Sequence, residues 1–341
     1  METISQFSSS GVHAVSYKAD TASEVKFDHY DLVIITSSWD SRCLTLIDSP
    51  LKEVPYAILL TFDDKDPNGV RDKNDSILEN YCSHISSVMF TISGLSTDID
   101  SVWSKISERL LDIRNRTNKA ISILFDLSCC PRYYAITLMS ICYKYGIACK
   151  IDYFYNECTY PEKSDVLSQE EIAFTAGKWE AKRIPHLTGR INPGIKNRFT
   201  VSIGFEGSKT LMILNEFEPD NVNILIPSPG YTDNYVDRAK EANQELFKSF
   251  GVTKQNEIYS YAADPIDVWT KVSVTVKENN GWNDYFLCAG SKPHSLGLAL
   301  AAFTLQTPSL IYSLPQEHKP VYVTPKSDCW LYSTAYLIVP C

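Results

Sequence analysis

The residues best suited to chemistry lie near the C-terminal end, in a short polar turn between two apolar runs. Residues 285–289 form an apolar run of strand length, and residues 296–303 have the composition of a buried helix. Gly290, Ser291 and Lys292 lie between them. A strand, a glycine turn and a helix start direct backbone N–H groups towards an anion, and the lysine adds a positive charge. The pattern predicts a phosphate- or nucleotide-binding turn.

The residues after Gly290 favour an ordered helix start. Ser291 is a predicted N-cap, and Pro293 falls in the first helical turn, where its missing N–H costs little. His294 lies one turn into the helix, where it could contact a ligand or transfer a proton. The alternative for His294 is a capping or surface role.

A second turn with glycine follows the apolar run 198–204. It lies between a predicted strand and a predicted helix, as the first turn does, and it combines small and basic residues with the acidic Glu206. Ligands of doubly wound sheets bind at the carboxyl ends of strands. We therefore expect ligand contacts from Gly204, Glu206, Gly207, Ser208 and Lys209.

Two strand ends in the N-terminal half carry similar polar residues. The predicted strand 30–36 leads to Ser38, Asp40 and Arg42. The predicted strand 119–126 ends at Asp126, and Arg132 follows it. We expect these side chains to contribute to ligand binding as well. The alternatives are that Arg132 ties two loops together, and that these ends are polar because strand ends generally are.

Strands and helices alternate along most of the chain, with an amphipathic helix expected at 98–114 and one long helix expected at 234–250. This alternation predicts an α/β fold with mainly parallel sheets flanked by helices. We expect two Rossmann-like units. The first is an N-terminal unit at 1–155, and 156–197 is a linker or an excursion over a binding face. The second unit is 198–341, and its last part is a C-terminal extension expected to form a hairpin.

The composition excludes several classes of protein. A net charge of −9 over 341 residues argues against a general nucleic-acid coat. No apolar run reaches the roughly 18 residues of a membrane span, and no signal peptide is evident, so a cytoplasmic protein is expected. Most of the ten cysteines lie in apolar runs without a C-x-x-C pair. They are expected to be reduced and buried, and no metal site is expected.

Standard catalytic and cofactor motifs are missing. The run Gly204-Phe-Glu-Gly207 is not G-x-G-x-x-G, and neither a P-loop nor a G-x-S-x-G elbow occurs. Cys129-Cys130-Pro-Arg132 lacks the C-x₅-R spacing of a thiol phosphatase. The sequence therefore predicts no cofactor and assigns no catalytic residue.

The turns at Gly204 and Gly290 resemble those of the CRISPR-associated Rossmann-fold (CARF) sensor domains over about residues 198–315. The resemblance rests on Gly204-Phe-Glu-Gly-Ser-Lys209 and on Gly290-Ser-Lys-Pro-His-Ser-Leu-Gly297. In that family, equivalent turns hold a ring-shaped oligoadenylate across a dimer axis. This chain departs from the family pattern, because Ala289 replaces a glycine, Ser291 replaces a threonine, and no nuclease motif follows. The resemblance implies a nucleotide-type ligand, a homo-oligomer, an effector partner and a place in bacterial antiviral defence.

Three functions are consistent with these patterns. The first is a nucleotide-sensing or regulatory module that acts with an effector. The second is an enzyme acting on a nucleotide or phosphorylated small molecule, with acid/base candidates Asp40, Asp126, Glu206, Asp264 and His294. The third is a structural subunit of a complex. None of the three requires a membrane.

Overall fold

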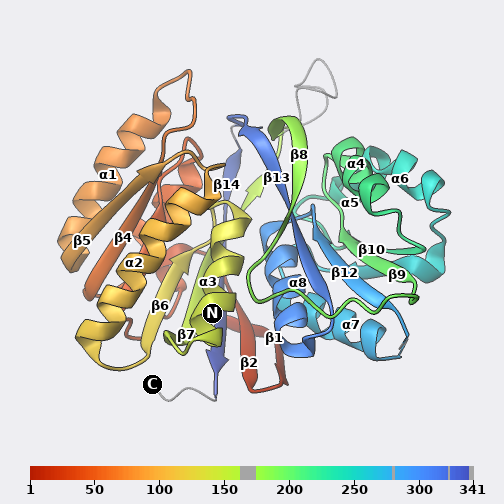
Figure 1. Cartoon of the computed structure of the whole chain (residues 1–341). Helices are drawn as coiled ribbons and strands as arrows, with labels where there is room; N and C mark the ends of the chain where they lie inside the picture. Colours follow the sequence, from red (N-terminus) through yellow and green to blue (C-terminus); the bar gives the residue numbers. More distant parts are fainter. Residues whose placement is uncertain (162–173, 279–280, 322, 338–341) are drawn as a thin grey trace. The chain divides into compact units, whose positions relative to one another are not determined.

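An eight-stranded sheet and a six-stranded sheet, both mainly parallel and flanked by helices, organise the described part of the chain (Figure 1). The computed structural model describes residues 1–161, 174–278, 281–321 and 323–337. Contacts divide the chain into unit 1, residues 1–167 and 318–341, and unit 2, residues 168–317. The predicted fold class, α/β with Rossmann-like units, is confirmed.

The sheet of unit 1 has five parallel strands in the middle and at one edge, and three antiparallel strands at the other. In sheet order its strands are β1 (Glu2–Ser9), β2 (Val12–Ala19), β14 (Thr324–Tyr336), β7 (Ala148–Thr159), β6 (Ile121–Asp126), β3 (Leu32–Thr36), β4 (Val54–Phe62) and β5 (Ser86–Gly94). Its helices are η1 (Ala22–Glu24), η2 (Ser41–Asp48), α1 (Val70–Ile85), α2 (Ile99–Thr117) and α3 (Arg132–Lys144).

The core of unit 1 follows from the apolar pattern. Every residue of β3 is buried, as expected for a central parallel strand covered on both faces. Leu78 and Cys82 of α1 pack with Val33 and Ile35 of β3 in one apolar cluster. In α2 the apolar residues spaced for one helical face are buried, which confirms the predicted amphipathic helix.

Unit 2 repeats the strand order of the parallel part of unit 1. In sheet order its strands are β11 (Glu257–Ser260), β10 (Asn221–Pro227), β9 (Asn197–Ser202), β12 (Asn283–Cys288), β13 (Ser309–His318) and β8 (Thr175–Arg183). Its helices are α4 (Gly207–Phe217), α5 (Tyr235–Ala242), α6 (Gln244–Ser249), η5 (Lys254–Asn256), α7 (Pro265–Glu278) and α8 (Lys292–Leu305).

Helices of unit 2 pack against its sheet and against one another. Ile213 of α4 and Leu246 of α6 pack with Phe199 and Val201 of β9. Helix α8 is buried along nearly its whole length, and the Trp269 indole of α7 donates to Thr304 Oγ1 at 2.9 Å. The buried apolar helix expected after Gly290 is thus present.

The structure divides the chain differently from the expected 1–155, 156–197 and 198–341. The C-terminal extension forms strand β14 rather than a hairpin, and it pairs antiparallel with β2 and β7 in the sheet of unit 1. In the expected excursion, residues 175–183 form edge strand β8 of unit 2, whereas residues 162–173 lie outside the described residues. The long helix expected at 234–250 is two helices, α5 and α6.

Eight of the ten cysteines are free thiols, and seven of these are buried, in keeping with the expectation from their apolar surroundings. Cys149 departs from that expectation, because it is disulfide-bonded. No helix of the described residues is long and apolar enough to span a membrane.

Candidate functional site

The sheet of unit 2 has a switch point between β9 and β12. From β9 the chain proceeds outwards through β10 and β11, and then returns to the other side of β9 with β12 and β13. Ligands of such sheets bind in the crevice at the carboxyl ends of the two strands that flank the switch point. In this unit those ends lead directly into the turns at Gly204 and Gly290.

The two glycine turns touch each other. A Cβ atom at Gly204 would lie 2.8 Å from the carbonyl oxygen of Ala289 and 3.5 Å from the Cα atom of Gly290. A Cβ atom at Gly290 would lie 2.0 Å from Ser202 Oγ and 2.8 Å from the carbonyl oxygen of Ile203. Glycine is therefore required at both positions, because any side chain would push the turns apart. The sequence predicted two important turns, and the structure brings them together.

Ser291 caps helix α8 as the sequence predicts. Its Oγ accepts from the backbone N–H of His294 at 3.2 Å and donates to the carbonyl oxygen of Ala262 at 2.7 Å. Lys292 is the first residue of the helix, and Pro293 follows it. Because the cap already occupies one N–H and proline has none, an anion at this end would depend on the helix dipole and on Lys292.

His294 lies beneath the turn and is fully buried. Its Nε2 donates to the carbonyl oxygen of Tyr261 at 3.0 Å, so its Nδ1 accepts from Ser202 Oγ at 3.3 Å. Burial lowers the pKa of His294 to about 4. The imidazole is thus neutral near pH 7, and it joins the turn after β11 to β9.

The charged residues of the Gly204 turn are engaged with strand β8. Glu206 Oε1 accepts from Lys209 Nζ at 3.0 Å and from Thr175 Oγ1 at 2.5 Å. Lys209 Nζ also donates to the Thr175 carbonyl oxygen at 2.7 Å. A Cβ atom at Gly207 would lie 1.9 Å from the carbonyl oxygen of Ala242, so this glycine lets α4 approach the end of α5. These contacts give three of the predicted residues a structural role, and Ser208 is exposed.

An aromatic group beside the Gly204 turn was not predicted. The rings of Phe205 and Tyr235 are 4.8 Å apart, and the guanidinium of Arg238 lies 4.9 Å from the centre of the Phe205 ring. Arg238 Nη2 is buried and has no hydrogen-bond partner among the described residues. Arg238 lies inside a helix, more than thirty residues beyond the turn, so sequence spacing gave no signal for it.

The equivalent edge of unit 1 lies between β3 and β6, and the segment after β3 contains a buried ion pair. Arg42 Nη2 donates to Asp40 Oδ2 at 2.6 Å, and Arg42 Nη1 donates to the carbonyl oxygen of Asn156 at 3.2 Å. Both charged residues are buried. Although burial opposes the charged form, the Asp40 carboxylate raises the pKa of Arg42 well above its ordinary value. Asp40 also caps η2 by accepting from the Arg42 backbone N–H at 3.0 Å.

The remaining predicted residues of unit 1 lie at the same edge. Ser38 Oγ accepts from the Asp40 backbone N–H at 3.2 Å. Asp126 is fully buried, and its Oδ1 accepts from the backbone N–H of Ser128 at 2.9 Å. Arg132 begins helix α3 and is half-buried. These residues lie at or after the ends of strands β3 and β6, and Asp40 and Arg42 are bonded to one another.

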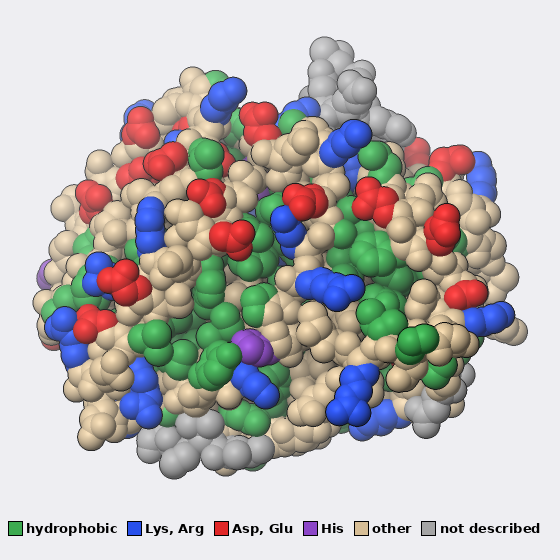
Figure 2. All heavy atoms as spheres, in the orientation of Figure 1, with side chains coloured by type: hydrophobic (Ala, Val, Ile, Leu, Met, Phe, Trp, Pro, Cys, Tyr) green, Lys and Arg blue, Asp and Glu red, His purple; other side chains and the backbone are tan. Residues whose placement is uncertain are grey.

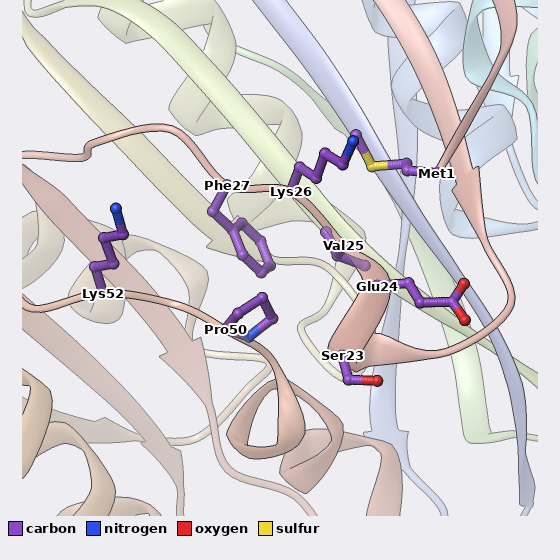
Figure 3. Close-up of a pocket in the computed structure, with 8 residues that line it drawn as sticks. All are labelled: Met1, Ser23, Glu24, Val25, Lys26, Phe27, Pro50 and Lys52. Carbon is purple, nitrogen blue, oxygen red and sulfur yellow. The ribbon is translucent and has the colours of Figure 1, made fainter.

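A separate hollow of about 510 Å³ lies in unit 1, away from every predicted binding residue. Figure 3 shows the Phe27 ring facing Pro50 in its floor, with Lys26 and Lys52 among the lining residues. On the face shown in Figure 2, acidic and basic side chains are intermixed. Among the described residues, no group of three His, Cys, Asp or Glu side chains is placed to hold a metal ion.

Comparisons with known proteins leave the family open. No family model and no curated protein matches the chain. A functionally unknown protein from Pseudomonas aeruginosa PAO1 is 9% identical at a TM-score of 0.23, with coverage of 84% of this chain and 93% of that one. The cytoplasmic domain of a prokaryotic cation chloride cotransporter is 12% identical at a TM-score of 0.24, with coverage of 85% and 98%. At these TM-scores, neither likeness assigns a function.

Proposed function

We propose that unit 2 is a nucleotide-sensing regulatory module that binds a nucleotide-type small molecule at its Gly204 and Gly290 turns. The observation that carries the proposal is the contact between these two turns at the switch point of the sheet. The turns expose backbone where a ligand of a doubly wound sheet would bind. A bulky side chain at either glycine would close that approach.

The charges near the turns favour an anion. Lys292 lies at the N-terminal end of α8, where the helix dipole also favours negative charge. Arg238 adds a second cation beside the Gly204 turn, with a buried Nη2 that lacks a hydrogen-bond partner among the described residues. Both cations would attract a phosphate near the turns, and an adenine-type ring would suit the aromatic side chains nearby.

A sensor suits this edge better than an enzyme. The acid/base candidate His294 is fully buried and neutral, and Glu206 is already engaged by Lys209 and Thr175. Neither group is placed to transfer a proton to a ligand above the turns. The effector partner and the antiviral setting that the CARF resemblance implies remain predictions.

The proposal is tested by calorimetric titration of the full chain with ATP and with a cyclic oligoadenylate. Lys292→Ala should weaken binding about tenfold or more, because a charged contact to phosphate contributes about 1.5–3 kcal/mol. Lys277→Ala, at an exposed lysine of α7, is the matched control and should bind as the parent does. Mass spectrometry after incubation should recover the nucleotide intact. Equal binding by the two variants, or turnover of the nucleotide, would overturn the proposal.

A further inference from the structure

As the described residues form them, the two sheets have four edge strands, and three of these are protected against pairing with another chain. Strand β1 begins with Glu2 and has a register shift between Thr3 and Ser5. Strand β11 is four residues long and begins with Glu257. Strand β8 carries several charged residues and a left-handed glycine, Gly177. Charges, bulges and shortness are the usual means of blocking an open sheet edge.

Strand β5 has none of these protections. It runs for nine residues, Ser-Ser-Val-Met-Phe-Thr-Ile-Ser-Gly, without a charge or a proline. Its pairing with β4 is regular from Val88 to Gly94. Within the part of the chain that the structure describes, β4 is its one strand neighbour, and Figure 1 shows β5 at the outer edge of the sheet.

The backbone groups that β5 leaves open can be identified. The carbonyl oxygen of Gly94 accepts from the Asp63 N–H at 2.9 Å, so Gly94 faces β4. On a parallel strand successive residues face opposite sides, so the N–H and C=O groups of Ser87, Met89, Thr91 and Ser93 point outwards. Lys105 Nζ donates to the outward carbonyl oxygen of Ser93 at 2.7 Å, in agreement with this assignment.

We infer that β5 pairs antiparallel with β5 of a second copy of this chain, which joins two unit 1 sheets across a two-fold axis. The axis falls at Met89, which pairs with itself, and Ser87 pairs with Thr91 of the second copy. In this register Ser93 takes no part in the pairing, so its carbonyl oxygen keeps the hydrogen bond from Lys105.

A second copy of the chain suits the open edge of β5, because the strand can pair with an identical strand. A two-fold axis brings each residue of the strand opposite a residue of the same strand, so a charge at or next to the axis would face a like charge. Strand β5 carries no charge, whereas the other three edges do. The exposed side chains of Val88 and Thr91 add β-branched surface to such a pair.

The test uses light scattering and native mass spectrometry of the full chain in the presence of a thiol reductant. The parent should have twice the 38.5 kDa mass of one chain. Thr91→Pro removes one outward N–H and leaves the ladder to β4 intact, because a proline whose N–H side faces away from the sheet is tolerated at an edge. It should weaken dimerisation at least a hundredfold, whereas Thr91→Val, which keeps the N–H, should dimerise as the parent does.

A second variant separates lost pairing from lost folding. Thr91→Lys keeps every backbone group and adds a charge to the edge, and it should also be monomeric. Far-ultraviolet circular dichroism establishes that each variant is folded, and if Thr91→Pro fails to fold, Thr91→Lys decides. A monomeric parent at tens of micromolar, or a folded Thr91→Lys that remains dimeric, would overturn the inference.

Discussion

The parallel parts of the two sheets share one strand order, but the turns at their switch points are held by different contacts. In unit 1 the segment after β3 is held by the buried ion pair of Arg42 and Asp40, and Arg42 also donates to the carbonyl oxygen of Asn156 in β7. In unit 2 the edge between β9 and β12 is held by direct backbone contact between the turns at Gly204 and Gly290. The same topology therefore supports a charged lock, the pair of Arg42 and Asp40, in one unit and a backbone contact between two glycine turns in the other.

This difference shows that polar residues at a strand end do not by themselves make a binding site. Arg42 and Asp40 satisfy each other, so a ligand at that edge would have to break a buried pair. Lys292 lies at the start of a helix beside two glycines, where a ligand would meet backbone and a cation. The comparison directs the search for a ligand to unit 2.

The sharpest test of the charged lock is Arg42→Met. Removing one partner leaves the Asp40 carboxylate buried without its counter-charge, which typically costs about 3–5 kcal/mol. Urea denaturation of the parent and the variant should show this loss in the free energy of unfolding. Arg116→Met removes an exposed arginine paired with Asp112 at 2.9 Å, and it should leave the stability nearly unchanged. A stability loss no larger than that of the control would mean that the lock does not hold unit 1.

The pH dependence of stability tests the neutral histidine of unit 2. The pKa of His294 falls from an ordinary value of 6.5 to about 4 in the folded chain. Between these values the unfolded chain binds a proton that the folded chain does not, so stability falls as the pH is lowered from 6.5 to 4. Each pKa unit is worth about 1.4 kcal/mol, so the total loss is about 3 kcal/mol.

His294→Gln removes the titrating group and should flatten the stability profile over that pH interval. Denaturant midpoints measured at intervals of half a pH unit would give both profiles. If the variant and the parent lost stability in parallel between pH 6.5 and 4, the buried histidine would not be the cause.

The contact between the glycine turns is tested by Gly290→Ala. The added Cβ atom would lie 2.0 Å from Ser202 Oγ and 2.8 Å from a backbone carbonyl oxygen, so the turns must separate. Overpacking of this kind costs about 1–3 kcal/mol. Thermal unfolding should detect the loss, whereas Ser208→Ala, at an exposed residue of the neighbouring turn, should leave the midpoint unchanged. An unchanged midpoint for Gly290→Ala would show that the turns are not in contact.

The smallest effect is expected from Ser291→Ala. This change removes the side chain that caps α8 and its hydrogen bond to Ala262, and loss of an N-cap costs about 1 kcal/mol. Ser291→Asp keeps a capping oxygen and should recover most of that stability. Its negative charge beside Lys292 should at the same time weaken nucleotide binding, so the pair of variants separates capping from ligand binding. Full nucleotide affinity in Ser291→Asp would count against an anion at this turn.

Most strands and helices could be predicted from the sequence, because each depends on residues that are close together in the chain. The buried run of β3, the amphipathic face of α2 and the cap at Ser291 depend on neighbouring residues, and all three are present. The sheet to which β14 belongs could not be predicted, because its place depends on pairing with β2 and β7, which are far away in the sequence.

The candidate site, too, could be predicted from the sequence only in its local features. Sequence spacing placed Gly204 and Gly290 at strand ends, but only the sheet order brings those ends together. The pairing of Glu206 with Lys209 and Thr175 was hidden because Thr175 belongs to the segment expected to be a linker. Arg238 was hidden because its contact with Phe205 arises from the packing of α5 against the turn.

Hydrogen exchange of the full chain, with and without ATP or a cyclic oligoadenylate, tests the comparison between the two edges most directly. A nucleotide that binds should slow exchange at residues 203–209 and 289–296 in unit 2 and leave residues 37–42 and 126–132 in unit 1 unchanged. Slower exchange confined to the unit 1 residues, or no protection at the glycine turns by a nucleotide that binds, would contradict the account.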